Sequence, residues 1–406
     1  MKGLIDIKWK EVTLNDVSKY SKERININEL TLKNYVSTEN MLPGKAGKII
    51  ASSLPNGSAI KYKRGQTLIS NIRPYFKKIW YADIDGGCSA DVLVFEISDE
   101  IDDKYFYYLL NQDHFFDYVL AGSKGTKMPR GDKQQIMMYP FKLPHKDEQK
   151  VIADTLSCLD NKIEINNRIN ETLEEMAQAI FKNWFVDFEP FKDGEFEDSE
   201  LGKIPAGWRV ISMEDCVTTI DNRGKTPPLS NRITPYPIID VKALSGASRI
   251  INYNNCTKYV ELNTYNNWFR SGHPKQQDIL ISTVGSLAEM KIFYGDKGCI
   301  AQNVVGFRSK YLSTLYLYQY FQYIKKDLIS YDIGSVQPSI KVTHIIKHKI
   351  VIPSNKVLKL FETIVSEISN MIFKNFEESQ TLITIRDALL PKLMSGEIRV
   401  PVEEVQ

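Results

Sequence analysis

The chain has 406 residues, of which 43% are hydrophobic and 25% charged, and its formal net charge is only +2. This length suits two or three domains with hydrophobic cores. The near-neutral net charge excludes nucleic-acid binding through a global positive field, so such binding would need local basic patches. The five cysteines are scattered and form no Cys-x-x-Cys pair, which argues against a disulfide framework or a zinc ribbon. No apolar run of about 20 residues is present, which predicts a cytoplasmic protein without membrane contact.

Residues 1–145 have the pattern of a mixed α/β domain. Short β-branched and aromatic runs at Thr67–Ser70, Ile79–Ala82 and Asp91–Ile97 predict strands, separated by Gly or Arg-Pro turns. Asp102 is placed to cap a helix that reaches Leu120. The aromatic face of this helix is typical of a core rather than of a ligand site.

A long helix is predicted over residues 146–188, which contain neither proline nor glycine. Asp147 and Glu148 place negative charge at the positive end of the helix dipole. Residues recur in steps of three and four to form a seam that is apolar at both ends and polar in the middle, as in a coiled coil. The seam residues are Ile152, Leu156, Leu159, Ile163, Asn166, Asn170, Leu173, Ala177, Ile180 and Trp184.

Residues 189–207 are predicted to form an acidic, solvated linker. The stretch Asp187–Glu200 carries seven acids and one lysine, and Pro190 and Gly194 interrupt regular structure. We expect this charge to keep the linker away from DNA.

The second half of the chain repeats the first. Residues 208–353 are predicted to be a second mixed α/β domain, 354–396 a second long helix, and 397–406 a frayed tail. Three motif pairs carry the repeat: Trp9–Val12 with Trp208–Ile211, Gln66–Ser70 with Asp278–Ser282, and Gly87–Ala90 with Gly298–Ala301. Adding 209 to the first seam gives Phe361, Val365, Ile368, Ile372, Asn375, Ser379, Leu382, Arg386, Leu389 and Leu393.

The two long helices have a polar seam centre in common. Two separate amphipathic core helices would show the same apolar spacing. The shared centre favours an antiparallel intrachain coiled coil, because this pairing sets Asn166 opposite Asn375 and a buried Asn pair fixes register. The predicted fold is therefore α/β (mixed α+β), with two tandem domains separated by two long helices in a pseudo-two-fold internal repeat.

Motifs of enzyme chemistry are poorly represented. Gly44–Lys48 and Gly224–Thr226 only hint at a phosphate loop, since the spacing fails and Pro227-Pro228 removes backbone donors where a helix should begin. No Gly-rich turn suits a dinucleotide or S-adenosylmethionine, and no Asn-Pro-Pro-aromatic tetrad is present. His344 and His348 lack a third metal ligand. We therefore predict no catalytic residue and no metal site in this chain.

Four loops combine cations, hydroxyls and amides as loops that bind DNA do. Such loops are often merely solvated, but a Gly-Ser loop occurs at equivalent places in both halves, at Gly122-Ser123 and Gly334-Ser335. The candidate DNA-binding residues are Arg73, Tyr75, Lys77, Lys78, Ser123, Lys124, Thr126, Lys127, Arg130, Arg223, Lys225, Thr226, Arg232, Ser335, Gln337, Ser339 and Lys341.

Together these features resemble the specificity subunits of type I restriction-modification systems, over nearly the whole chain. The motifs that carry the resemblance are Ile72–Lys78, Asp147–Ala153, Phe181–Phe188, Leu201–Trp208 and Leu390–Ile398.

The resemblance implies a non-catalytic subunit in which each α/β domain, a target recognition domain, recognises one half of a bipartite site in double-stranded DNA. The helices would space these domains and dock two methyltransferase subunits, and nuclease-translocase subunits would complete the complex. S-adenosylmethionine, ATP and Mg²⁺ would then belong to the partners, and the methylated base would be adenine at N6. A helix of about 40 residues rises ~60 Å, the length of about 18 base pairs. Asn355-Lys356-Val357 replaces Asp147-Glu148-Gln149 in the second helix, which implies less symmetric docking.

Two other classes of protein remain open from the residues alone. A coiled-coil scaffold that binds protein would show no salt-sensitive DNA affinity. A fused methyltransferase or nuclease with a degenerate motif would methylate or cut DNA as a single chain.

Overall fold

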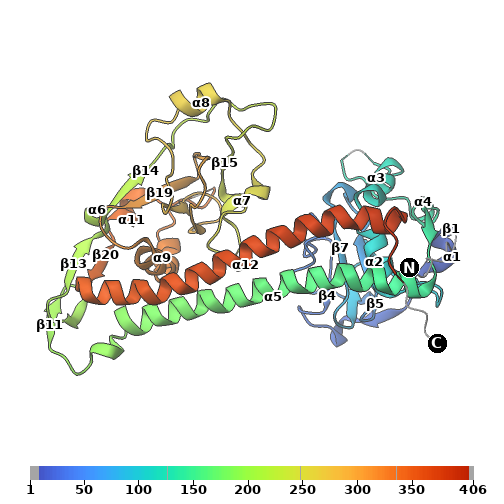
Figure 1. Cartoon of the computed structure of the whole chain (residues 1–406), viewed down its shortest axis with the longest axis horizontal. Helices are drawn as coiled ribbons and strands as arrows, with labels where there is room; N and C mark the ends of the chain where they lie inside the picture. Colours follow the sequence, from blue (N-terminus) through green and yellow to red (C-terminus); the bar gives the residue numbers. More distant parts are fainter. Residues whose placement is uncertain (1–8, 126, 247, 335, 402–406) are drawn as a thin grey trace. The chain divides into compact units, whose positions relative to one another are not determined.

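A computed structural model describes residues 9–125, 127–246, 248–334 and 336–401 (Figure 1). The chain divides into two compact units, residues 1–164 with 379–406 and residues 165–378. Each long helix therefore contributes one half to each unit. This division differs from the predicted domain boundaries, which follow the order of the chain. Within the described ranges, no helix is both long and apolar enough to cross a membrane.

Unit 1 is built on two four-stranded sheets. One sheet is antiparallel, and all four residues of its central strand β6 are buried, the polar Thr67 and Ser70 included. The order of this sheet is β2 (Ser18–Tyr20), β9 (Val92–Ile97), β6 (Thr67–Ser70) and β7 (Ile79–Tyr81). The order of the second sheet is β3 (Arg24–Asn26), β5 (Ser58–Tyr62), β8 (Gly86–Cys88) and β4 (Tyr35–Val36). The other elements are β1 (Lys10–Thr13), paired with β10 (Pro140–Leu143), and α1 (Leu14–Val17), α2 (Asp103–Leu110), α3 (Asp113–Ala121), α4 (Lys133–Met137), η1 (Ile27–Glu29) and η2 (Pro74–Phe76).

Unit 2 repeats the main sheet of unit 1, as the sequence predicted, whereas the second sheet is reduced to a parallel pair of strands. Its main sheet has the order β14 (Val217–Ile220), β19 (Val304–Ser309), β16 (Ile279–Ser282) and β17 (Met290–Ile292). The remaining strands are β11 (Phe196–Ser199) with β12 (Gly202–Pro205), β13 (Arg209–Ser212) with β20 (Lys349–Ile352), and β15 (Ile238–Ile239) with β18 (Cys299–Ile300). The helices are α6 (Met213–Cys216), α7 (Val241–Leu244), α8 (Leu262–Asn267), α9 (Thr314–Tyr323), α10 (Lys325–Ser330), α11 (Val342–Ile346), η3 (Glu189–Phe191) and η4 (Tyr253–Asn255).

The predicted helix over Asp102–Leu120 is two helices. Asp102 caps the first one as predicted, since its carboxylate accepts from the amides of Lys104 and Tyr105, both at 3.0 Å. The first helix ends because Gln112 adopts an extended backbone, and its side chain donates to the free carbonyl of Leu109 at 3.1 Å. The aromatic helix of unit 2 also divides, at Ile324 between α9 and α10, but the backbone of Ile324 is not extended and no side chain caps the end of α9.

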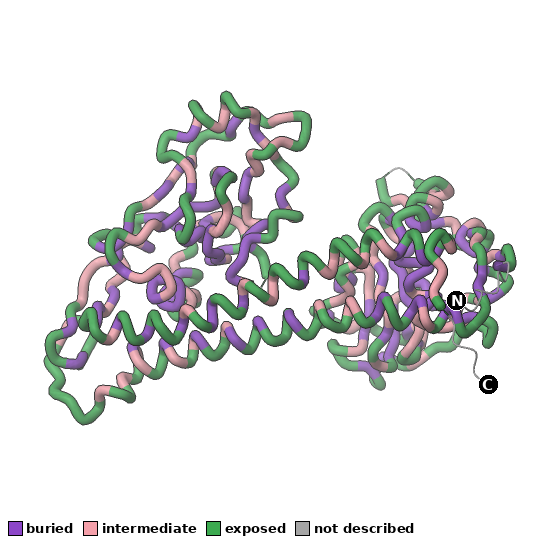
Figure 2. The backbone as a smooth tube through the Cα atoms, viewed as in Figure 1, coloured by how far each residue is buried: buried purple, intermediate pink, exposed green. Residues whose placement is uncertain are grey.

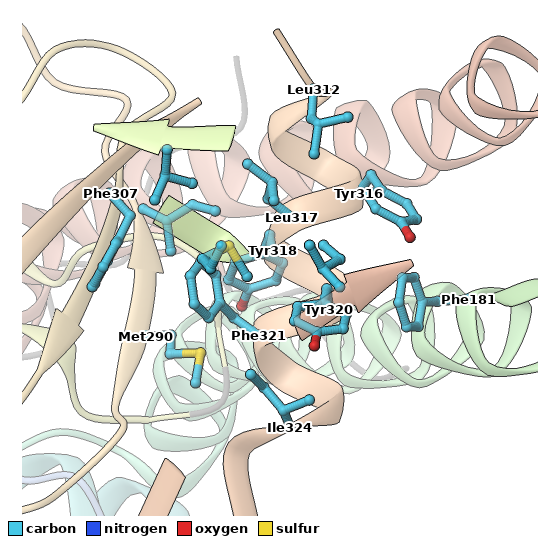
Figure 3. Packing of buried hydrophobic residues seen from close by; sticks show 14 of the residues in the cluster. Phe181, Met290, Phe307, Leu312, Tyr316, Leu317, Tyr318, Tyr320, Phe321 and Ile324 are labelled. Carbon is cyan, nitrogen blue, oxygen red and sulfur yellow. The ribbon is translucent and has the colours of Figure 1, made fainter. Parts of the chain in front are cut away.

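The aromatic faces of these helices belong to the core, as predicted. In unit 2, Tyr316, Leu317 and Phe321 on α9 pack with Phe307 of β19 and Phe181 of the first long helix (Figure 3). Each is nearly inaccessible to water, and burying such a side chain stabilises the fold by roughly 1.5–3 kcal/mol. This packing fixes the main sheet against the long helix.

The long helices are α5 (Lys146–Phe185) and α12 (Asn355–Ser395). In unit 1 the beginning of α5 and the end of α12 share one core, through Ile152 and Leu393. In unit 2 the end of α5 meets the beginning of α12, where the rings of Phe181 and Phe361 lie 6.2 Å apart. The helices are therefore antiparallel, as the fold class predicted, and Figure 2 shows buried positions recurring along both.

The seam residues differ in how far they are buried. Those that are buried are Ile152, Leu156, Asn166, Asn170, Leu173, Ala177, Phe361, Val365, Ile368, Ile372, Ser379 and Leu393. Those that are half-buried are Leu159, Ile163, Ile180, Trp184, Asn375, Leu382, Arg386 and Leu389.

The polar centre of the seam forms hydrogen bonds between the helices. The Asn375 amide donates to Oδ1 of Asn170 at 2.9 Å, and the Asn170 amide donates to the carbonyl of Ile372 at 3.2 Å. Asn166 donates to the backbone carbonyl of Asn375 at 3.4 Å and to Glu378 at 2.8 Å. The side-chain partner of Asn375 is thus Asn170, one helical turn from the predicted Asn166.

The predicted linker and tail are more ordered than expected. Part of the acidic stretch forms the β11–β12 hairpin, and Phe191 packs edge-on against Trp208 with ring centres 5.0 Å apart. In the tail, Arg399 forms a two-pronged ion pair with the buried Glu148, at 2.6 and 3.0 Å. The prediction of a frayed tail is therefore wrong for residues 397–401, because a charged partner and Trp9, whose indole also donates to Glu148, hold them.

Candidate nucleic-acid interface

In unit 1 the structure joins two of the predicted loops. The loop after β6 lies against the loop after α3, where the amide of Arg73 donates to the carbonyl of Pro129 at 2.8 Å. The amide of Gly131 donates to the carbonyl of Asn71 at 3.1 Å, and Lys124 and Arg130 exchange backbone hydrogen bonds at 2.9 Å. We call residues 71–78 with 123–131 the first loop pair.

Unit 2 contains the same arrangement. The amide of Gly285 donates to the carbonyl of Pro338 at 3.0 Å, and the amide of Ile340 donates to the carbonyl of Thr283 at 2.8 Å. Residues 283–289 with 332–341 form the second loop pair. The candidate residues chosen from the sequence do not include its first segment, Thr283–Glu289, although the match of Asp278–Ser282 to Gln66–Ser70 places this loop directly after β16.

The Gly-Ser loop of unit 2 contains a glycine that its backbone requires. A Cβ atom on Gly334 would overlap the carbonyl oxygen of Gln337, so no larger residue fits this tight turn. Gly122 differs, because a Cβ atom there would meet only the end of the Gln135 side chain, which can move aside. The backbone of the loop pair therefore requires glycine in unit 2 alone.

Ion pairs hold three of the six candidate cations in unit 1. Lys77 lies 2.8 Å from Asp113, Lys124 lies 2.6 Å from Asp132, and Arg130 lies 3.3 Å from Asp91. Lys78 donates to the carbonyl of Thr38 at 2.5 Å, and burial lowers its pKa. Ser123 donates to the carbonyl of Leu120 at 2.8 Å.

Arg73, Tyr75 and Lys127 are exposed at the same surface. Among the described residues, no acid lies within 4.0 Å of the charged groups of Arg73 and Lys127, so both cations face solvent. Thr126 lies outside the described residues.

Lys45 is a further cation at this surface that sequence analysis did not select. Its amide donates to the carbonyl of Lys77 at 2.9 Å, and its ammonium group lies 2.8 Å from Asp113. The hydrogen bonds from Lys45 and Lys77 together lower the pKa of Asp113 to about 2. Asp113 therefore stays ionised at neutral pH and holds two lysines beside the first loop pair.

In unit 2 the candidates are divided between several places. Gln337 and Lys341 are exposed and Ser339 is half-buried in the second loop pair, whereas Ser335 lies outside the described residues. Lys225 is exposed. The hydroxyl of Thr226 accepts a hydrogen bond from the side chain of Gln302 at 2.7 Å. The next residue, Asn303, accepts at its carbonyl from the amide of Thr283, which belongs to the second loop pair.

The two remaining candidate arginines of unit 2 pair with acids. Arg223 is bound by Asp221 at 2.8 and 3.0 Å, and Arg232 lies 3.1 Å from Glu261. Because Glu261 is the N-cap residue of α8, this ion pair places Arg232 beside the start of α8 and not in the second loop pair.

The described part of the chain holds no cluster of three or more His, Cys, Asp or Glu side chains that suits a metal ion. His344 and His348 both contact the ring of Tyr331, with centroid distances of 5.6 and 6.3 Å.

Comparisons with known proteins identify one family. A family model described as the type I restriction modification DNA specificity domain matches residues 6–175 and 205–378. The chain is 29% identical over 325 residues to the type I restriction enzyme MjaIX specificity subunit of Methanocaldococcus jannaschii, covering 74% of this chain and 70% of that protein. It is 27% identical to the HindI specificity subunit of Haemophilus influenzae, covering 96% and 99%.

A solved structure shows a similar fold. The S subunit of the type I restriction-modification system from M. genitalium matches with a TM-score of 0.54 and 16% identity, over 97% of this chain and 98% of that one.

Proposed function

Since this chain belongs to the type I restriction-modification DNA specificity family, we propose that its two loop pairs each recognise one half of a bipartite site in double-stranded DNA. The chain itself carries no catalytic group in this proposal. Methyltransferase subunits supply S-adenosylmethionine chemistry at adenine N6, and nuclease-translocase subunits supply the reactions that need ATP and Mg²⁺.

The observation that carries the proposal is the repeated loop pair. The two loop pairs lie about 200 residues apart in the sequence and are held by equivalent backbone hydrogen bonds, such as those that the amides of Arg73 and Gly285 donate. The exposed side chains that they carry differ. A constant scaffold with variable tips suits two sites of different sequence. Arg and Lys in the first pair suit guanine or phosphate, and Gln337 in the second suits adenine.

Apolar residues on the outer faces of the helices support docking of methyltransferase subunits. On α5 these are Ile165, Ile169 and Met176, and on α12 Leu360, Ile364 and Met371, all between 37% and 56% exposed. Both sets have spacings of four and seven residues, so each forms a stripe along one side of its helix. Exposed stripes of this kind mark surfaces that another protein covers.

Methylome sequencing tests DNA recognition. A host would express this chain with the methyltransferase encoded beside it, and a second host the methyltransferase alone. We expect a bipartite adenine motif only when this chain is present. A stable complex that produces no motif, or DNA affinity that does not fall with salt, would favour the protein-binding scaffold instead.

The docking surface has a separate test. Ile169→Asp places a charge in the α5 stripe and should abolish co-purification with the methyltransferase, because a buried unpaired charge is strongly unfavourable. Asn167→Asp adds the same charge at an exposed position outside the stripe and serves as the control. Equal co-purification of both variants would exclude this stripe as the docking surface.

A further inference from the structure

The first loop pair presents two aromatic side chains to solvent. Tyr75 is 46% exposed and Phe76 is 37% exposed, and their ring centres lie 4.6 Å apart. Both belong to the single-turn helix η2, whose Pro74 is buried. Exposing two adjacent rings is unfavourable in water, so a pair held at a loop tip indicates a surface that another molecule covers.

The backbone around these rings is rigid and strained. Arg73 and Lys77, on either side of η2, have φ values of 51° and 50°, in the left-handed region. Hydrogen bonds hold the loop on both sides, from Arg73 to Pro129 at 2.8 Å and from Gly44 to the carbonyl of Phe76 at 2.8 Å. Such strain persists only where the surrounding structure imposes it, and it occurs often at functional sites.

The second loop pair provides an internal comparison. Gly285 and Ala288 occupy the places of Arg73 and Lys77 and also have positive φ, at 86° and 56°. Between them unit 2 has Ser286 and Leu287, and Leu287 is only 9% exposed. Both turns therefore begin and end at residues with positive φ, but the turn of unit 2 is one residue shorter, and only unit 1 has aromatic rings at its tip.

The surroundings of the ring pair are basic. Arg73 and Lys127 are exposed cations of the same loop pair, which also contains Lys77, and Lys45 lies beside it; Lys45 and Lys77 share the carboxylate of Asp113. Apolar side chains that unstack bases in DNA-bound proteins are typically flanked by cations that neutralise phosphates. This combination of charge and exposed rings suits duplex DNA.

We propose that Tyr75, supported by Phe76, is a wedge that unstacks one base step in the half-site recognised by the first domain, and that the second domain recognises its half-site without a wedge. The proposal rests on the proposed function and adds to it that the two halves of the site are distorted unequally. Specificity in the first half-site would then include how easily its sequence deforms.

The test uses the complex of this chain with its methyltransferase and a DNA duplex that contains the methylated motif. 2-Aminopurine, whose fluorescence rises when it unstacks, is placed in turn at each position except the methylated adenines, which the methyltransferase flips. Lys127→Ala, which should weaken one half only, identifies the half-site of the first domain. We expect a several-fold rise at one step in that half-site and none in the other.

Three variants separate the wedge from a structural role. Tyr75→Ala should abolish the fluorescence rise and weaken binding about tenfold, the scale of a lost base–aromatic stack. Tyr75→Phe keeps the ring and should retain both signals. Tyr311→Ala removes a tyrosine of unit 2 that is 59% exposed and should change neither.

The outcomes distinguish the two proposals. Specific binding and methylation without a fluorescence rise in the first half-site, or a rise that Tyr75→Ala leaves intact, would overturn the wedge and leave the proposed function standing. Loss of the motif altogether in the wild-type complex would overturn the proposed function, and the wedge with it.

Discussion

Arg73 occupies the position that Gly285 has in the second repeat, and comparing the two residues shows the conformational energy that a non-glycine residue loses there. Both residues have a positive φ, which glycine adopts freely and other residues adopt at a cost of roughly 1–2 kcal/mol. Because the turn can be built with glycine, the guanidinium group at residue 73 is best explained by a role in binding.

The first prediction compares two substitutions of Arg73. Arg73→Ala and Arg73→Gly should both weaken DNA binding. Each should also reduce the number of phosphate contacts, as measured by the slope of log affinity against log salt concentration, by about one. Arg73→Gly should be more stable than Arg73→Ala by about 1 kcal/mol, because it relieves the backbone strain. Urea denaturation and binding titrations at several salt concentrations measure these effects. Gly285→Ala is the matched control and should lose about 1 kcal/mol; equal stability of both Arg73 variants would contradict the strain.

The second prediction concerns Asp113, which neutralises Lys45 and Lys77. Asp113→Asn should release both lysines and strengthen non-specific DNA binding, with a steeper salt dependence. The pKa of Asp113 is lowered to about 2, so the stability that its ion pairs add is present above about pH 4 and is lost as the pH falls toward 2. The contribution is small because the carboxylate is largely exposed.

Denaturation of the wild type and of Asp113→Asn at pH 6 and pH 2.5 measures this linkage. The stability difference should shrink at the lower pH, and a constant difference would mean that the ion pairs do not contribute.

The sequence predicted where the loops lie better than it predicted which of their side chains form ion pairs. The recurrence of Gly122 and Gly334 located one segment of each loop pair, although only Gly334 lies where backbone atoms exclude a larger residue. The partners of Lys77 and Arg130 could not be predicted, because Asp113 and Asp91 lie in other elements and reach them only through tertiary folding. Three of the candidate cations are thus paired with acids that the sequence did not indicate as their partners.

At the scale of elements, prediction succeeded where a pattern was long. The heptad spacing of α5 and α12 continues for about 40 residues, and the helix bounds follow it closely. Several elements of two or three residues, such as β4 and β8, are too short to show a period and were missed, whereas the short strands β6 and β7 were predicted from their composition and flanking turns. The break between α2 and α3 depends on one side chain, Gln112, and leaves no periodic signal.

The third prediction concerns the polar seam of unit 2. Asn375→Leu leaves Oδ1 of Asn170 without its donor and should cost about 1–3 kcal/mol. The double variant Asn170→Leu/Asn375→Leu should recover most of this loss, because an apolar pair suits the seam, although it specifies register less strictly. A double-mutant cycle by urea denaturation measures the coupling. Asn167→Leu, at an exposed position of α5, is the control, and additive losses would show that the two amides act independently.

At the scale of the molecule, the internal repeat was the most informative feature of the sequence. It predicted that both units share one topology, which the identical strand orders of their main sheets confirm. It did not reveal that each unit takes one half of each long helix, since that depends on contacts between segments more than 200 residues apart. The repeat also does not determine how far apart two half-sites lie on DNA, which the helices are expected to set.

The fourth prediction tests this expectation with one heptad inserted after Asn166 and a matching heptad before Asn375. Seven residues keep the phase of the seam and lengthen each helix by ~10 Å, which corresponds to about three base pairs. Methylome sequencing should therefore show the same two half-sites with a longer spacer. Three base pairs also rotate one half-site by nearly a third of a turn of DNA, so methylation should become slower. An insertion in α5 alone breaks the seam register and should abolish the motif, whereas an unchanged spacer in the paired variant would show that helix length does not set the spacing.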